Sequence, residues 1–217
     1  MSVCRILPGT RPDADIYALT DSGLSLGRPL EEVVRALLGA GIKILQYREK
    51  KKDGKELLEE GRLLRRITRE YGACLLIDDH VDIAMLCDAD GVHIGQSDIP
   101  LPDVRSLLGP EKVIGLSTHS PEQARAAVAM GADYIGVGPI FATQTKVCEP
   151  VSLRYLDWVA ANIAAPFVAI GGIKEHNIAE VASHGAKCCA LVSELVGAPD
   201  IEAKVAAVRR AMHSRNN

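Results

Sequence analysis

The stretch GADYIGVGPIFATQTK, residues 131–146, passes without interruption from the end of a helix through a strand into a loop. Gly131 is typical of the left-handed cap that closes a helix. Tyr134 to Val137 form a short run of β-favouring residues, and Gly138-Pro139 is expected to end that strand. If this order repeats along the chain, the fold belongs to the α/β class, in which helices alternate with strands.

The loop after this strand carries two hydroxyls and an ammonium group, on Thr143, Thr145 and Lys146. A phosphate-bearing ligand lying over the C-terminal end of a strand requires donors of this kind. From this segment alone, a surface loop and an anion site are equally good interpretations.

The same order of elements repeats along the chain. Strands are expected at 15–20, 42–48, 74–77, 91–94, 113–116, 134–137, 167–170 and 188–192. Helices are expected at 29–38, 53–71, 81–87, 101–108, 120–131, 153–162, 174–183 and 201–213.

Short connections leave no room for a linker, so we expect one domain over 1–217, with a loose leader at 1–14 and a frayed tail at 214–217. Eight strands, each followed by a helix, predict an α/β single-domain (β/α)8 TIM barrel. A doubly wound open sheet is the alternative, weakened because no Gly-x-Gly-x-x-Gly follows the first strand.

The composition favours a small-molecule protein. The chain has 217 residues, of which 47% are hydrophobic and only 4% aromatic. Such an aliphatic composition is typical of parallel sheets covered by helices. A net charge of -3 with scattered basic residues gives no footprint for nucleic acid or a membrane surface. No signal peptide or spanning segment is evident, so a cytoplasmic location is expected. The cysteines are expected to be mostly small buried hydrophobes: Cys4, Cys74, Cys87, Cys148, Cys188 and Cys189.

Polar side chains continue past the second strand, where a barrel interior should be apolar. Gln46, Arg48 and Lys50 are two residues apart and therefore share one face of the strand. Two cations and an amide at a barrel mouth favour a polyanionic or heteroatom-rich ligand. Pairing of both cations with carboxylates on the rim is the alternative.

Carboxylates follow the next two strands, at Asp79 and Asp98. Beside phosphate-binding cations, such a pair favours a Mg²⁺ site that substrate phosphates complete. General acid/base catalysis is a competing use. Each residue also has a structural interpretation, Asp79 as a helix N-cap and Asp98 as a turn residue.

The remaining strand ends carry hydroxyls and glycines. Ser117 follows the fifth strand, beside His119, which is an acid, a base or a structural residue. His93 lies within the fourth strand and is interpreted as a satisfied core residue. The last two strands end at Gly171-Gly172 and Val192-Ser193, where barrels often bind phosphate through backbone N–H groups.

Four ordered motifs resemble the signatures of the thiamine phosphate synthase family: QYREK at 46–50, ADGVHIGQSD at 89–98, IGLSTH at 114–119, and the opening stretch through Lys146. The resemblance covers nearly the whole chain. It implies a transferase that joins a hydroxymethylpyrimidine diphosphate to a thiazole phosphate, by departure of diphosphate and capture of a carbocation.

The resemblance also assigns residues. It implies that Asp79 and Asp98 hold Mg²⁺. It places the pyrimidine diphosphate on Gln46, Arg48, Lys50, Ser117 and Lys146, of which the last four neutralise or bind the departing group. It places the thiazole phosphate on Thr143, Thr145, Gly172, Val192 and Ser193.

One position departs from the family pattern, because Asp78 stands where the family usually has Asn. An ionised Asp only accepts hydrogen bonds and repels diphosphate. Asp78 is expected to join the metal shell, to be neutralised by Lys50, or to mark altered activity. The alternatives are a thiazole tautomerase-like isomerase, a non-catalytic ligand-binding paralogue and, more remotely, a Schiff-base aldolase using Lys50 or Lys146. The sequence leaves room for a homo-oligomer.

Overall fold

In the computed structural model, which describes residues 5–143 and 149–214, the strands form one closed parallel barrel in sequence order. β1 pairs with β2 on one side and with β8 on the other, which closes the ring. The strands are β1 (Ile16–Leu19), β2 (Ile44–Tyr47), β3 (Cys74–Asp78), β4 (Gly91–Ile94), β5 (Val113–Thr118), β6 (Tyr134–Val137), β7 (Phe167–Ile170) and β8 (Cys189–Leu191).

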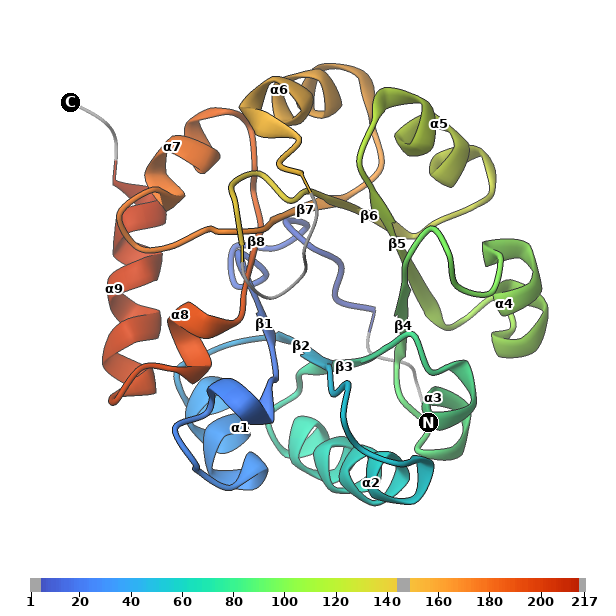
Figure 1. The fold of residues 1–217 in the computed structure, drawn as a ribbon, viewed down its shortest axis with the longest axis vertical. Helices are drawn as coiled ribbons and strands as arrows, with labels where there is room; N and C mark the ends of the chain where they lie inside the picture. Colours follow the sequence, from blue (N-terminus) through green and yellow to red (C-terminus); the bar gives the residue numbers. More distant parts are fainter. Residues whose placement is uncertain (1–4, 144–148, 215–217) are drawn as a thin grey trace.

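Helices surround the strands on all sides (Figure 1). They are α1 (Leu30–Gly39), α2 (Gly54–Glu70), α3 (Val81–Leu86), α4 (Leu101–Leu108), α5 (Pro121–Ala129), α6 (Ser152–Asn162), α7 (Ile178–Ser183), α8 (Ser193–Val196) and α9 (Ile201–His213), with a 3-10 turn η1 (Ser22–Leu24). The predicted (β/α)8 TIM barrel is confirmed, and the doubly wound open sheet is wrong.

Local signals explain several helix ends. Asp53 caps α2 through the backbone N–H groups of Lys55 and Glu56, and Glu56 returns a bond to Asp53, which completes a capping box. Ser120 caps α5. Gly131 adopts φ +86°, the left-handed backbone that its glycine predicted.

Three elements differ from the sequence prediction. α7 begins at Ile178 and not at 174, because the Asn177 side chain accepts from the Lys174 N–H at 2.7 Å and closes a turn first. η1 and α8 were not predicted, since elements of three and four residues carry no periodic signal.

The side chains form two packed layers. One cluster fills the barrel interior, including Tyr17, Leu76 and Tyr134, and a larger one lies between the strands and the helices. The cysteines at 74, 87, 188 and 189 are buried thiols, as predicted, whereas those at 4 and 148 lie outside the described residues.

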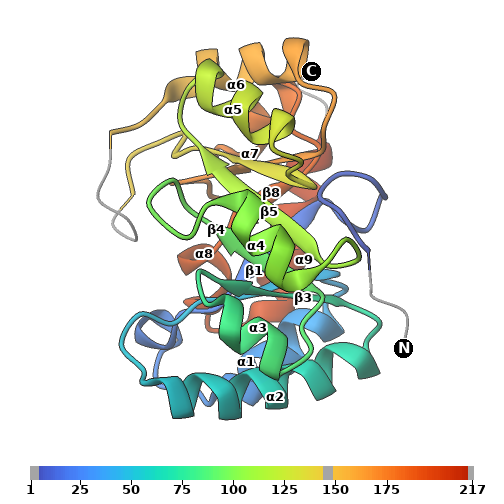
Figure 2. The ribbon, with the colours of Figure 1, turned by 90° about the vertical axis from the view of Figure 1, so that its right-hand side faces the viewer.

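The leader from Arg5 onward is packed and not loose. Ile6 and Ala14 are buried in the interior cluster, because this segment crosses the barrel end where the strands begin. In Figure 2 it lies at the right, opposite the segment that leaves β6. Within the described ranges, no helix has the length and apolar character that crossing a membrane requires.

Candidate active site

The predicted site residues follow the C-terminal ends of parallel strands, which face the same end of the barrel. Gln46 is 3% exposed, on the interior face of β2, while Leu45 and Tyr47 belong to the outer layer, as alternation predicted. The Gln46 Nε2 atom is buried without a hydrogen-bond partner among the described residues. A buried amide donor of this kind has a desolvation cost that a bound acceptor would offset.

The two cations after β2 are paired with carboxylates. Arg48 contacts Asp21 at 3.1 Å and Asp78 at 3.8 Å. Lys50 contacts Asp78 at 2.8 Å and also pairs with Asp79. The rim-pairing interpretation therefore describes these contacts, and Lys50 lies where it can neutralise Asp78.

Lys50 is held as a cation by these contacts. Burial alone would lower its pKa, but the hydrogen bonds and charges of Asp78 and Asp79 outweigh burial, so the net pKa lies above its ordinary value. A Schiff-base lysine requires the opposite shift. The geometry therefore gives no support to an aldolase that uses Lys50.

Asp79 has a constrained backbone. Its φ of +60° lies in the left-handed region, and its N–H donates to the His93 carbonyl at 2.9 Å. The N-cap interpretation is wrong, because His80 occupies that position and makes no side-chain cap bond. Such backbone conformations persist where the surroundings enforce them, and they cluster at functional sites.

Asp98 follows β4, which pairs with β3. Its Oδ2 accepts the Gly95 N–H at 2.6 Å, so the turn interpretation is confirmed for one carboxylate oxygen. Over 5–143 and 149–214, no group of three or more His, Cys, Asp or Glu side chains gathers as a metal cluster. The donor set consists of carboxylates beside an ammonium, and this chemistry fits Mg²⁺ with one or two protein ligands and substrate phosphates.

Ser117 lies on the interior face of β5. Its Oγ is 2.9 Å from His93 Nε2, and its carbonyl accepts from Gln96 Nε2 at 2.6 Å. His93 Nδ1 lies 2.8 Å from the Tyr134 hydroxyl, so His93 is a satisfied interior residue, as predicted. His119 Nδ1 contacts the Gly138 carbonyl at 2.5 Å, which supports its structural interpretation.

The glycines after β7 allow two loops to approach closely. Gly171 and Gly172 have φ of +102° and +63°, and a Cβ on Gly172 would lie 2.6 Å from the Ala142 carbonyl oxygen. The segment after β6 therefore runs against this strand end, with Phe141 N–H bonded to the Gly171 carbonyl at 3.0 Å.

The segment after β8 turns directly into α8. Val192 is its N-cap residue and Ser193 its first residue. The N–H groups of a first helical turn have no partner within the helix. Val192 and Ser193 thus follow β8 directly, and β8 pairs with β7, the strand that Gly172 follows. Thr143 is the last described residue before a gap, and Thr145 and Lys146 lie outside the described residues.

Asp21 is a site residue that sequence reasoning missed. It follows β1, and its carboxylate binds Arg48 and caps η1. Glu49 was also missed: it is 7% exposed and accepts from the N–H and hydroxyl of Ser22 at 2.9 and 2.8 Å. The available signal was the position of Asp21 at a strand end.

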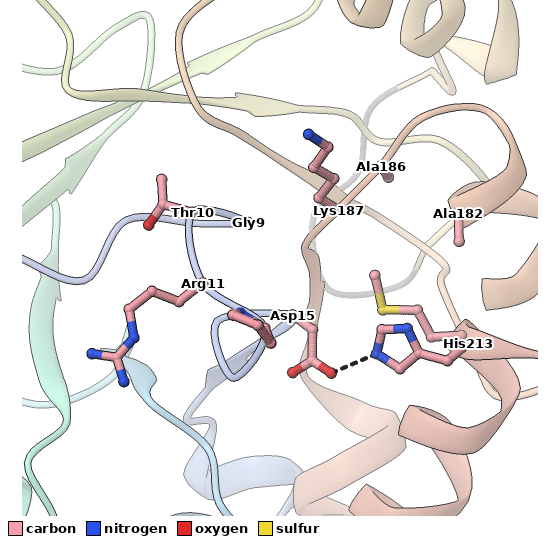
Figure 3. Close-up of a pocket in the computed structure, with 10 residues that line it drawn as sticks. Gly9, Thr10, Arg11, Asp15, Ala182, Ala186, Lys187 and His213 are labelled. Atoms are coloured by element: carbon pink, nitrogen blue, oxygen red, sulfur yellow. Dashed lines mark hydrogen bonds and ion pairs between the residues drawn. The ribbon is translucent and has the colours of Figure 1, made fainter.

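A cavity of about 410 Å³ lies at the opposite end of the barrel, where β1 and β8 begin (Figure 3). Its lining includes Arg11, Asp15, Lys187 and His213. Asp15 is bound by Arg209 and by His213 Nε2, each at 3.0 Å. None of the predicted site residues lines this cavity, so it is separate from the candidate site.

Comparisons with known proteins agree with this geometry. Residues 16–195 match the family model described as thiamine monophosphate synthase. A thiamine-phosphate synthase of Lawsonia intracellularis is 59% identical over 95% of this chain and 96% of its own length. One of Pelotomaculum thermopropionicum is 61% identical over 91% of each chain. The solved thiamine phosphate pyrophosphorylase of Pyrococcus furiosus is 36% identical, with a TM-score of 0.85 over 93% of this chain and 96% of that one.

Proposed function

Because the chain belongs to the thiamine monophosphate synthase family, we propose that it condenses 4-amino-2-methyl-5-hydroxymethylpyrimidine diphosphate with a thiazole phosphate. The products are thiamine phosphate and pyrophosphate. The observation that carries the proposal is the buried, unpartnered Gln46 Nε2 beside Arg48, a cation on the same strand face. An amide donor next to cations suits a heteroaromatic ring that carries a diphosphate.

In the first step, the C–O bond between the pyrimidine methylene and the diphosphate breaks. Both electrons stay on the diphosphate oxygen. Arg48 and Lys50 exchange carboxylate partners for diphosphate oxygens and stabilise the growing negative charge. Ser117 and Lys146 contribute a hydroxyl and an ammonium to the same group.

In the second step, the thiazole nitrogen donates its lone pair to the carbocation and forms the C–N bond. This step requires orientation of the second substrate more than proton transfer. We assign its phosphate to Thr143, Thr145 and the backbone of Gly172, Val192 and Ser193.

Asp79 and Asp98 would hold Mg²⁺, which supplies a Lewis acid for the diphosphate when bound. Asp78 lies beside them and accepts from Lys50 at 2.8 Å. We propose that Lys50 neutralises Asp78 in the free enzyme, which reduces its repulsion of the substrate. A cytoplasmic location and purely small-molecule partners are part of the same proposal.

The test combines the purified protein with both phosphorylated substrates, with Mg²⁺ and with EDTA. Thiamine phosphate and pyrophosphate should appear in equal amounts in the presence of Mg²⁺ only. A Gln46→Leu variant should raise KM for the pyrimidine diphosphate and leave KM for the thiazole phosphate unchanged. No product with any divalent metal would sink the proposal and favour a non-catalytic paralogue.

A further inference from the structure

Four polar groups form a hydrogen-bonded chain through the barrel interior. The Tyr17 hydroxyl lies 2.9 Å from the Tyr134 hydroxyl, which lies 2.8 Å from His93 Nδ1. His93 Nε2 then lies 2.9 Å from Ser117 Oγ. The chain draws on β1, β6, β4 and β5 in turn and leads from the centre of the interior cluster to a residue of the candidate site.

Two glycines make room for this chain. A Cβ on Gly115 would lie 2.1 Å from Cζ of Tyr134, and one on Gly136 would lie 3.1 Å from Cε1 of His93. Neither glycine has a left-handed backbone that would otherwise require it. The interior is therefore shaped around the Tyr134 ring and the His93 ring.

The buried end determines the direction of the chain. Tyr17 is 2% exposed, and among the described residues its hydroxyl bonds only to Tyr134. The other hydrophobic residues of the interior cluster are aliphatic, apart from Tyr134 and the thiols of Cys74 and Cys188, which are weak acceptors. The Asp78 carboxylate acts on both tyrosines through its charge. Leaving a buried O–H without an acceptor costs about 1–3 kcal/mol. Tyr17 therefore donates to the Tyr134 oxygen.

Each later link follows from the first. Tyr134 has its oxygen occupied as an acceptor, so its own hydrogen is donated to His93 Nδ1. His93 must then carry its hydrogen on Nε2 and donate to Ser117 Oγ, which directs the Ser117 hydrogen away from the imidazole. Burial also raises the pKa of both tyrosines well above the ordinary value, so neither hydroxyl ionises.

We propose that His93 and Tyr134 are positioning residues that fix the Ser117 hydroxyl as a hydrogen-bond donor toward the substrate. The proposal rests on the proposed function, in which Ser117 contacts the diphosphate. As the C–O bond breaks, charge grows on the diphosphate, and a fixed donor stabilises it where an acceptor would repel it. No proton is transferred from these four hydrogen-bonded groups to the substrate.

The direct test is the tautomer of His93 in the ligand-free protein. Proton–nitrogen correlation spectra of ¹⁵N-histidine-labelled protein at pH 7 should show Nε2 protonated and Nδ1 bare. A His93→Gln variant, which loses that signal, assigns the resonance. A proton on Nδ1, or on both nitrogens, would overturn the proposal. This measurement does not depend on turnover, so it stands even if the proposed function fails.

The kinetic test uses matched tyrosine variants. Tyr134→Phe removes the link next to His93 and should lower kcat about tenfold, with KM changed less than twofold. Tyr17→Phe removes the donor at the start of the network but keeps the Tyr134 hydroxyl beside its acceptor, His93 Nδ1. Its kcat should therefore fall less, about twofold to threefold. Equal losses in the two variants would contradict the proposed direction.

A double-mutant cycle separates positioning from a general structural role. If Tyr134 acts through Ser117, then Tyr134→Phe combined with Ser117→Ala should be no slower than Ser117→Ala alone. Multiplied losses would mean that Tyr134 acts by another route. If Tyr134→Phe does not fold, the tautomer spectrum of the wild-type protein still decides the question.

Discussion

The mouth of the barrel has two sides of different construction. After β2 and β3, charged side chains bind one another, as in the contacts of Lys50 with Asp78 and Asp79. After β7 and β8, the predicted contacts come from the backbone of Gly172 and Ser193. Binding by charged side chains is sensitive to substitutions that change charge, whereas binding by backbone groups is sensitive to substitutions that displace the backbone. This contrast suits two substrates, one with a departing diphosphate and one with a phosphate that is only held.

The largest effect on turnover is expected on the charged side. Asp79→Ala should lower kcat/KM about a thousandfold, equivalent to about 4 kcal/mol of transition-state stabilisation. Asp79→Asn tests the charge alone, because Asn tolerates the left-handed backbone of this position. Steady-state pyrophosphate release at saturating Mg²⁺ is the measurement. The control is Asp103→Asn, because Asp103 is an exposed carboxylate in the first turn of α4. Full activity of Asp79→Ala would show that Asp79 does not belong to the metal site.

A smaller effect is expected from a change of shape on the glycine side. Gly172→Ala should raise KM for the thiazole phosphate about tenfold to a hundredfold, because the new Cβ would displace the segment at Ala142. Gly131→Ala is the matched control, since its φ is +86° and nothing lies within 4 Å of its Cβ. If Gly131→Ala raises KM for the thiazole phosphate as much as Gly172→Ala does, the rise comes from backbone strain and not from displacement of the loop.

The third prediction is a lower KM for the pyrimidine diphosphate. Asp78→Asn removes a carboxylate that binds Lys50 and lies 3.8 Å from Arg48. It should lower KM for the pyrimidine diphosphate about fivefold, about 1 kcal/mol, because the partly exposed Lys50 limits the electrostatic gain. Titration of the substrate at fixed thiazole phosphate measures it. An unchanged or higher KM would mean that Asp78 aids binding, for instance within the metal shell.

The smallest effect on turnover is expected at the opposite end of the barrel. Burial would raise the pKa of Asp15, but hydrogen bonds from Arg209 and His213 and the charge of Arg209 outweigh it and leave the pKa below its ordinary value. A carboxyl with a lowered folded-state pKa stabilises the fold above its unfolded pKa, about 3.9, and loses this contribution as pH falls through the folded value.

Asp15→Asn should therefore destabilise the protein at pH 7, and the difference from wild type should shrink below about pH 3.9. Urea unfolding midpoints across that range measure it, with Asp13→Asn, a half-buried carboxylate paired with Arg11, as the control. kcat at pH 7 should not change. A loss of turnover at unchanged stability would instead connect this end of the barrel to the site.

The limits of prediction from sequence follow from what each residue depends on. β6 was predicted to the residue, because Gly131 and Gly138 flank a short apolar run. α7 began four residues later than expected, because the Asn177 side chain closes a turn that periodicity does not report. The pairing of Arg48 with Asp21 was missed, since it joins loops from two different strands.

By itself, the sequence determined the barrel, the family and the strand ends that carry polar groups, because these depend on local periodicity and on ordered motifs. Only the tertiary structure decided how those groups are connected. The loop that follows residues 131–137 is seated on Gly171 and Gly172, and Lys50 lies between two carboxylates. The hydrogen-bonded chain to Ser117 joins four strands that are separate in sequence and meet only when the barrel closes, so its direction is a property of the packed interior.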